Sequence, residues 1–177
     1  CDNVPVPSLG PDDVLIKPEI AGVNFIDTYF RTGLYPVELP FTLGQECGGK
    51  VARVGINVKD IQPGDRVVAL VGSSFAERVI APRSKVVKLP KALDTRTAVA
   101  AWLQGLTAVA LTHTSYPVKS GDYVLVHAAA GGVGLLLVQI ASSLGAHVIG
   151  TTSTTKKAER VKTCLLYTSP SPRDLST

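Results

Sequence analysis

The sequence predicts an α/β plus β protein, in which a small barrel-like β domain is followed by a parallel βαβ unit. Three observations lead to this fold class. Over residues 1–94, short apolar runs alternate with Gly, Pro and Asp, which is typical of a small antiparallel β domain. From residue 95 onward, longer apolar segments with helical spacing replace them. A glycine-rich turn at residues 128–134 then separates an apolar strand from a helix.

The β domain is expected to contain five strands, at residues 14–18, 47–54, 65–71, 76–81 and 85–89. A short helix is predicted at residues 24–31, and Gly33 is expected to end it. Pro63 and Gly64 predict a tight turn before the third strand, because Pro fixes φ and Gly supplies a positive φ. The domain therefore consists of short strands joined by well-defined turns.

Helices dominate the second part, residues 95–163. Asp94 or Thr95 is expected to cap a helix that runs through Leu103, with Gly105 interrupting it before a second apolar segment. A strand at 123–127, a helix at 135–144 ended by Gly145, and a strand at 147–151 follow. Strand, helix and strand in this order form one βαβ unit, whose parallel strands need a right-handed crossover.

Composition excludes several classes of protein. The chain has 177 residues, is 45% hydrophobic and carries a formal net charge of +4, which argues against a disordered, collagen-like or coiled-coil chain. Its charges are scattered, so neither a nucleic-acid surface nor a polybasic membrane surface is expected. The apolar stretches at 98–111 and 133–144 are shorter than the ~20 residues needed to span a bilayer. Three separated cysteines offer no disulfide framework and favour a reducing, cytoplasmic compartment.

Both ends of the chain suggest a fragment of a longer protein. The sequence begins at Cys1 and contains no Met. Residues 164–177 lose the preceding periodicity and place Pro170 and Pro172 among serines, so we expect a non-native tail from a cloning or adaptor sequence. An ordinary terminus is the alternative. Because one βαβ unit alone leaves a parallel sheet incomplete, we expect this fragment to be catalytically inactive.

The glycine-rich turn predicts a dinucleotide site. The Gly-x-Gly-x-x-Gly fingerprint falls on Ala129, Gly131 and Gly134, with Ala in place of the first Gly. The motif follows a strand and opens a helix, where backbone N–H groups favour a pyrophosphate. The residues expected to bind it are Ala129, Ala130, Gly131, Gly132, Val133 and Gly134. A tight turn without a ligand is the alternative.

The end of the second parallel strand indicates which cofactor is preferred. NAD sites normally carry Asp or Glu there to bind the ribose hydroxyls, but residues 150–157 contain no carboxylate. Ser153, Lys156 and Lys157 can instead donate to, or neutralise, a 2′-phosphate. NADPH is therefore the predicted cofactor, with Ser153 and Lys157 as the residues expected to bind its 2′-phosphate. The alternative for Lys156 or Lys157 is a solvated start to the next helix.

Several linked motifs resemble the zinc-free quinone oxidoreductases of the medium-chain dehydrogenase/reductase superfamily, which include zeta-crystallin. They are GVNFIDTY at 22–29, RTGLYP at 31–36, PFTLGQE at 40–46, LQGLT at 103–107, and HAAAGGVG at 127–134 followed by LLLVQ. The resemblance covers residues 14–162. It implies an N-terminal GroES-like catalytic domain, a truncated Rossmann domain, NADPH, and a cleft between the two domains.

The resemblance also implies roles for individual residues. Zinc-dependent relatives have Cys at the position of Asn24 and His at that of Gln45, and the four cysteines of a structural zinc site are missing as well. No metal ligand is therefore predicted, because catalytic zinc needs such side chains. By position, Asn24, Tyr29 and Tyr35 line the nicotinamide and quinone cleft, and Thr107 contacts the nicotinamide.

Each of these residues has an alternative role. Tyr29 can be a half-buried packing residue, and Asn24 can cap the short helix. A structural ion pair is the expected role of Glu46, and His127 can simply pack beside the glycine turn. No His, Cys and Ser constellation supports covalent catalysis.

The resemblance implies an NADPH-dependent quinone reductase that acts on a small quinone or another α,β-unsaturated carbonyl and forms a homodimer at full length. An enal or enone reductase of the same superfamily is one alternative. A non-catalytic, crystallin-like protein that binds NADPH or RNA is another, although RNA binding is disfavoured because the sequence has no basic stripe.

Overall fold

The structure is a computed structural model that describes residue 5 and residues 8–164. It divides into two compact units, residues 1–103 and 104–177, which are treated separately below. Helix α2 (Thr95–Val109) contributes to both units. The boundary between residues 94 and 95 stays a prediction, and the tail expected after Cys164 lies outside the described residues.

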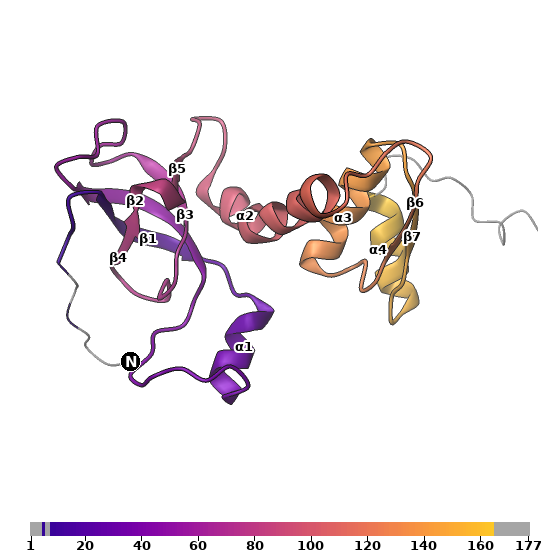
Figure 1. Cartoon of the computed structure of the whole chain (residues 1–177), viewed down its shortest axis with the longest axis horizontal. Coiled ribbons are helices and arrows are strands. Elements are labelled where there is room, and N and C mark those ends of the chain that lie inside the picture. Colours follow the sequence, from indigo (N-terminus) through magenta and orange to yellow (C-terminus); the bar gives the residue numbers. More distant parts are fainter. Residues whose placement is uncertain (1–4, 6–7, 165–177) are drawn as a thin grey trace, which may run out of the picture. The chain divides into compact units, whose positions relative to one another are not determined.

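A curled, five-stranded antiparallel sheet forms the first unit, and its strand order is β4-β1-β2-β3-β5 (Figure 1). The strands and one short 3-10 helix are β1 (Asp13–Ala21), β2 (Glu46–Val54), β3 (Arg66–Leu70), β4 (Val79–Pro82), η1 (Arg83–Lys85) and β5 (Val86–Lys88). All five predicted strands are confirmed. The sheet is a half-barrel of the GroES-like type.

The core of this unit is a cluster of buried apolar side chains from the strands of the sheet. Val14 and Ile16 of β1, Val67 and Ala69 of β3, and Val86 of β5 are buried in one cluster. Residues two apart on a strand point to the same face, so this spacing explains the alternation in the sequence. Burial of one such side chain contributes about 1.5–3 kcal/mol.

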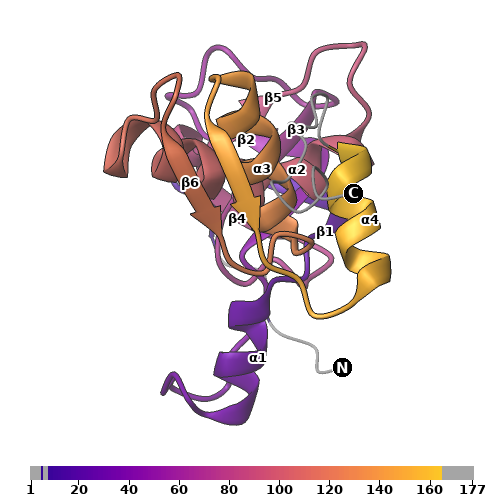
Figure 2. The same ribbon diagram turned by 90° about the vertical axis from the view of Figure 1, so that its right-hand side faces the viewer.

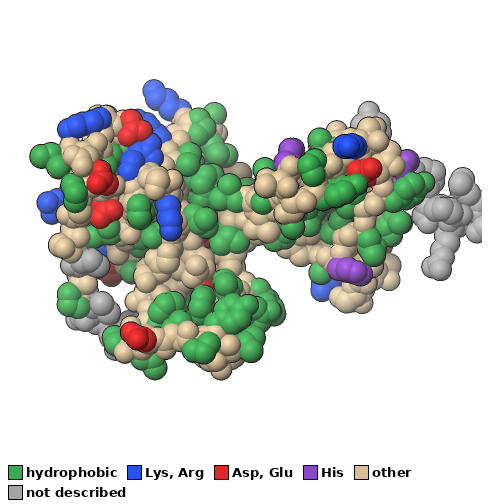
Figure 3. All heavy atoms as spheres, in the orientation of Figure 1, with side chains coloured by type: hydrophobic (Ala, Val, Ile, Leu, Met, Phe, Trp, Pro, Cys, Tyr) green, Lys and Arg blue, Asp and Glu red, His purple; other side chains and the backbone are tan. Residues whose placement is uncertain are grey.

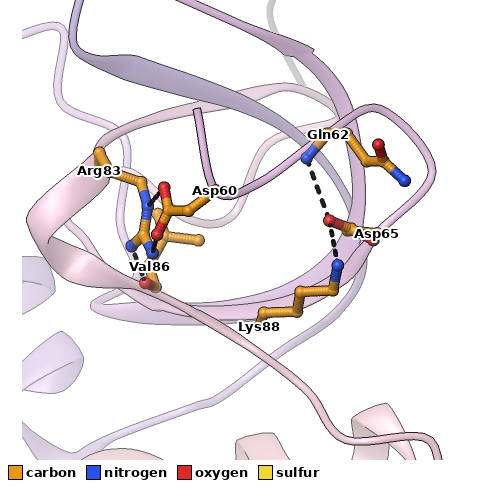
Figure 4. A network of polar contacts seen from close by, with 6 residues as sticks. All are labelled: Asp60, Gln62, Asp65, Arg83, Val86 and Lys88. Carbon is orange, nitrogen blue, oxygen red and sulfur yellow. Dashed lines mark hydrogen bonds and ion pairs between the residues drawn. The ribbon is translucent and has the colours of Figure 1, made fainter. Parts of the chain in front are cut away.

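An ionic network fastens the loop before β3 to the segment around η1 (Figure 4). Arg83 pairs with the Asp60 carboxylate through two nitrogens and also donates to the Val86 carbonyl. Lys88 lies 2.8 Å from the Asp65 carboxylate. The hydrogen bond from Arg83 lowers the pKa of Asp60, and that from Lys88 lowers the pKa of Asp65.

The short helix α1 (Phe25–Thr32) connects β1 to β2, as predicted. Asn24 is its N-cap and forms a capping box with Asp27, which satisfies backbone N–H groups at the start of the helix. The helix ends at Gly33, whose φ of 75° is accessible mainly to glycine. The capping role considered for Asn24 is confirmed.

Helix α2 corrects one prediction. It continues through Gly105 to Val109 and then into a π-helix, η2 (Ala110–Ser115). A glycine inside a helix costs only about 1 kcal/mol relative to Ala. Burial of Val99 before Gly105 and of Ala108 after it outweighs that cost. Asp94 caps the helix, since its Oδ1 accepts a hydrogen bond from the Thr97 N–H at 2.9 Å.

The second unit contains the expected βαβ unit and a further helix. Its elements are β6 (Tyr123–Val126), α3 (Gly132–Ser143), β7 (His147–Gly150) and α4 (Thr155–Cys164). Figure 2 shows β6 and β7 side by side, and they pair in parallel. Helix α3 begins three residues before the predicted Leu135, because Gly131 is the N-cap and the glycines themselves form the first turn.

A small core joins the sheet to its helices. Val126 of β6 is buried with Val138 of α3 and Val161 of α4, and Val124 and Val148 pack against them. The pattern is that of a truncated Rossmann domain. Within the described residues, no helix is long and apolar enough to cross a membrane.

Candidate functional site

The glycine turn allows α3 to start directly against the end of β6. A Cβ atom on Gly134 would lie 2.4 Å from the Ala128 carbonyl oxygen and 2.8 Å from the Ala129 Cα. Both neighbours are backbone atoms that cannot move aside, so only glycine fits. The Ala128 carbonyl also accepts the Gly131 N–H at 2.8 Å. The N–H groups of the first turn of α3 are therefore available at the end of the sheet, where an anion is favoured.

Alanine at the first fingerprint position is accommodated by a second glycine. Ala129 is fully buried, and a Cβ on Gly150 would lie only 2.8 Å from the Ala129 Cβ. Gly150 is the last residue of β7. Ala129 thus fits at the position of the first fingerprint glycine because Gly150, on the neighbouring strand, has no side chain.

A cavity of about 400 Å³ lies beside this turn, at the carboxyl ends of the two strands. Its lining combines the turn with the residues that follow β7: Ala128, Ala130, Gly131, Thr151, Thr152, Ser153 and Lys157. The Ala129 N–H donates to the Thr151 carbonyl at 3.0 Å and ties the two segments together. Among the residues that the structure describes, no acidic one lines the cavity.

Lys157 and Ser153 meet in the lining of the cavity. The Lys157 Nζ donates to the Ser153 Oγ at 3.1 Å. Both side chains also line the cavity, whereas Lys156 is exposed and does not line it. Lys157, the lysine that the sequence prediction selected for the 2′-phosphate, therefore lines the cavity, whereas Lys156 does not. A cation and a hydroxyl in this place suit a phosphate and offer no carboxylate to bind the two ribose hydroxyls.

The described residues fit the phosphates of a dinucleotide. The turn has room for backbone to approach a ligand, the helix start favours negative charge, and the far end carries a lysine. His127, at the end of β6, contacts the Thr151 hydroxyl at 3.1 Å through Nδ1 and does not line the cavity.

In the first unit, Asn24 lies in a buried polar cluster. It is 8% exposed, and its Nδ2 donates to the Glu46 Oε1 at 2.9 Å. The other Glu46 oxygen, Oε2, accepts the Leu103 backbone N–H at 2.9 Å. The expected ion pair of Glu46 is wrong: among the ion pairs of the described residues, none includes it. Backbone and amide donors satisfy this carboxylate instead of a cation.

Asp27 supports the same cluster from α1. Its Oδ2 accepts the Asn24 backbone N–H at 2.8 Å, and its Oδ1 accepts the Gly44 N–H at 3.2 Å. The Cys47 thiol is buried next along β2, where desolvation, together with the Glu46 charge, raises its pKa to about 12. Such a thiol stays protonated at neutral pH and is a poor nucleophile.

Tyr29 and Tyr35 belong to an exposed aromatic cluster on and after α1. Their ring centroids lie 5.3 Å apart in an edge-to-face arrangement. Phe25 packs on Tyr29 in the same way, and Phe30 contacts Tyr35. Figure 3 shows hydrophobic side chains gathered over this segment. Tyr29 is half-buried, as the packing alternative requires, whereas Tyr35 is 45% exposed.

Thr107 is half-buried on α2, within the second unit. The site residues predicted from the sequence therefore form two groups. One comprises Asn24, Tyr29 and Tyr35 around α1. The other comprises the residues of the glycine turn with Ser153 and Lys157, whereas Thr107 lies on α2 in the same unit and does not line the cavity. Within the described residues, no three His, Cys, Asp or Glu side chains are grouped as a metal site would require.

Comparison with known proteins defines the class. Residues 10–91 match the family described as the alcohol dehydrogenase GroES-like domain. A GroES-like unit followed by a βαβ unit with a glycine turn is the arrangement of the quinone oxidoreductase structures of the medium-chain dehydrogenase/reductase superfamily that this chain resembles. Within that class it is a homologue of the quinone oxidoreductases.

Three relatives illustrate the homology. A probable quinone oxidoreductase of Schizosaccharomyces pombe is 48% identical over 154 residues, which are 86% of this chain and 47% of that protein. The structure of Escherichia coli quinone oxidoreductase complexed with NADPH matches with a TM-score of 0.86 and 39% identity, covering 93% of this chain and 51% of the other. A 2-haloacrylate reductase of Burkholderia is 41% identical over 169 residues, 91% of this chain and 51% of that protein. The chain thus spans about half the length of the relatives it matches.

Sequence reasoning missed four contributors to the two groups. Thr151 and Thr152 line the cavity, and their place directly after a parallel strand could have indicated them. Asp27 and Glu46 hold Asn24. The capping-box spacing from Asn24 to Asp27 was visible in the sequence, whereas no local pattern links Asn24 to Glu46.

Proposed function

We propose that the whole protein is an NADPH-dependent quinone reductase. The observation that carries this proposal is the pairing of Lys157 with Ser153 beside the glycine turn, in a cavity whose described lining residues include no carboxylate. This combination favours a ribose that carries a 2′-phosphate. The homology to quinone oxidoreductases supports the choice of acceptor.

Each group of residues has a separate task in this proposal. The backbone N–H groups from Ala129 to Gly134 hold the pyrophosphate, and Ser153 and Lys157 hold the 2′-phosphate. Thr107 contacts the nicotinamide. When bound, NADPH supplies the hydride that reduces the acceptor, so the protein's contribution is binding and orientation.

The residues around α1 act on the acceptor. Asn24 donates a hydrogen bond from its amide to the carbonyl oxygen that gains negative charge during reduction, where a hydrogen-bond donor stabilises that charge. Tyr29 and Tyr35 offer aromatic faces and edges to a planar quinone. We propose that no zinc takes part, because Asn24 and Gln45 provide neither thiolate nor imidazole. Metal analysis of the intact enzyme checks this, and stoichiometric zinc contradicts it.

A second candidate function is reduction of an α,β-unsaturated acid or ketone. The observation in its favour is the 41% identity to a 2-haloacrylate reductase. Both reactions need a hydride and a hydrogen bond to a developing oxyanion, so the described residues suit either acceptor. The shape of the acceptor pocket decides between them.

The cofactor is tested on this chain by calorimetric titration with adenosine 2′,5′-bisphosphate and with 5′-AMP. These ligands carry the adenosine half of the cofactor and differ only in the 2′-phosphate. The proposal predicts that the bisphosphate binds at least about tenfold more tightly. Equal affinity contradicts a 2′-phosphate site.

The acceptor is tested in a full-length enzyme in which residues 8–163 replace the matching half of the Schizosaccharomyces pombe relative. NADPH oxidation is followed with 1,4-benzoquinone, with 2-chloroacrylate and without an acceptor. Faster turnover with the quinone supports the first function, and faster turnover with the acrylate supports the second. Tight NADPH binding with no turnover indicates a non-catalytic binding protein.

Sedimentation of the same protein tests the proposed homodimer. The cytoplasmic location that we also propose rests on cysteine usage alone.

A further inference from the structure

The Glu46 side chain is completely buried at the start of β2 (0% exposed). Removing a carboxylate from water is costly unless donors replace its hydration. The proposed function uses no carboxylate at this place, and no cation pairs with Glu46 among the ion pairs of the described residues. The position of this side chain therefore calls for a physical explanation.

Its two oxygens are held by donors from different parts of the first unit. Oε1 accepts from the Asn24 amide, and Oε2 accepts from the Leu103 backbone N–H on α2, each at 2.9 Å. On a third side, a Cβ atom on Gly22 would lie 2.2 Å from Oε1. The carboxylate is thus enclosed, with one donor for each oxygen.

This arrangement sets the orientation of the Asn24 carboxamide. A carboxylate only accepts hydrogen bonds, so the amide nitrogen, and not its oxygen, must face Glu46. Asp27 holds the Asn24 backbone N–H at the same time. A 180° flip of the amide, which exchanges its donor and acceptor ends, would set two acceptors against each other.

We propose that Glu46 is a positioning residue for the reduction of the acceptor. It keeps the Asn24 amide in the orientation that offers an N–H to the substrate carbonyl. The proposal rests on the proposed function, in which Asn24 is that donor. Glu46 touches neither cofactor nor substrate in this role and acts through Asn24 alone.

Glu46→Gln tests the idea with almost no change in shape. A glutamine has one acceptor oxygen, and the Leu103 N–H, fixed in the backbone, takes it. The glutamine nitrogen then faces Asn24, whose amide must flip so that its oxygen accepts. The variant therefore keeps the contact between residues 24 and 46 but reverses the polarity of the carboxamide, which also turns the amide oxygen away from the start of α1, where it accepts a hydrogen bond in the capping box.

The first measurement uses nitrogen-15 NMR on the 177-residue chain. In the unmodified protein, we expect the side-chain N–H signals of Asn24 to be shifted and protected from solvent exchange by Glu46. In Glu46→Gln, these signals should move to an exposed position and lose their protection. Asn24 signals without protection in the unmodified chain overturn the proposal, whether or not the variant folds.

The second measurement compares turnover in the chimeric full-length enzyme described above. Glu46→Gln should lower kcat at least about tenfold, while KM for NADPH stays within about twofold, because the cofactor cavity lies in the other unit. Asn24→Asp lowers kcat similarly, because it removes the donor. In the Asn24→Asp background, Glu46→Gln should have almost no additional effect.

Val86→Ala is the structural control, since Val86 is buried in β5 and belongs to the apolar core cluster. It should lower the melting temperature without changing kcat per folded enzyme. If Glu46→Gln reduces kcat by the same factor with and without Asn24→Asp, Glu46 is merely structural. If Asn24→Asp retains full kcat while NMR shows the protected amide, the orientation is correct and the role given to Asn24 in the proposed function is wrong.

Discussion

Replacing Lys157 by Ala tests how the cofactor is chosen. The Lys157 Nζ lies 3.1 Å from the Ser153 Oγ in the lining of the cavity. A hydrogen bond to a charged group contributes about 1.5–3 kcal/mol. Because the Lys157 side chain is exposed, water screens its charge and the lower end of this range applies. Each 1.4 kcal/mol or so is a factor of ten in Kd, so NADPH affinity should fall roughly tenfold.

Affinity for NADH should change by less than about twofold, because NADH carries no phosphate for this lysine to bind. Fluorescence or calorimetric titration of the chain with both cofactors measures the difference. The effect on NADPH should shrink as salt rises, since the Debye length falls from about 10 Å at 0.1 M to about 3 Å at 1 M. Lys156→Ala, on the adjacent exposed lysine that does not line the cavity, is the matched control. Equal losses for NADPH and NADH, or an equal loss in the control, refute the reasoning.

Three further predictions follow from the geometry. Gly134→Ala should lower the NADPH affinity measured by titration at least about tenfold, because the added Cβ would lie 2.4 Å from the Ala128 carbonyl oxygen. Gly105→Ala should raise the free energy of unfolding by about 0.5–1 kcal/mol in urea, because α2 is continuous and the added methyl group meets no close neighbour. Asp60→Asn should reduce the loss of stability in acid. Arg83 lowers the pKa of Asp60 in the folded state, so this stabilisation is complete above the unfolded pKa of about 4 and is lost as pH falls through the folded value.

Matched controls separate these effects from general damage. Gly72→Ala places a methyl group in open space in the first unit, so it should leave NADPH binding unchanged. Glu77→Gln removes an exposed carboxylate outside the network of Figure 4 and should leave the acid dependence of unfolding as it is. A destabilising Gly105→Ala would mean that α2 is broken at this residue.

Much of the fold could be predicted because its signals are local. Strand alternation, the capping residue Asp94 and the positive-φ glycine Gly33 each depend on a few adjacent residues. The continuity of α2 was missed because the cost of Gly105 is local, whereas the burial that offsets it is tertiary. The start of α3 was placed too late because its glycines have low helix propensity and yet form the first turn.

The site shows the same division. The glycine turn and the lysine pair were visible in the sequence, but only the fold shows that Lys157 lines the cavity and Lys156 does not. The absent side chain of Gly150 on β7 makes room for Ala129 in the turn after β6, and these residues are 21 positions apart in the sequence. The sequence suggested that Glu46 pairs with a cation. Its actual hydrogen-bond donors were missed because they lie 22 residues before it and 57 residues after it along the chain. Such long-range contacts leave no periodic trace in a single sequence.

Steady-state oxidation of NADPH and NADH by the chimeric full-length enzyme, with 1,4-benzoquinone as acceptor, tests the central claim most directly. The account predicts quinone-dependent oxidation of NADPH with a kcat/KM at least about tenfold above that for NADH, and loss of most of this preference in Lys157→Ala. Oxidation of both cofactors at equal kcat/KM, or NADPH oxidation that does not depend on the quinone, would contradict it.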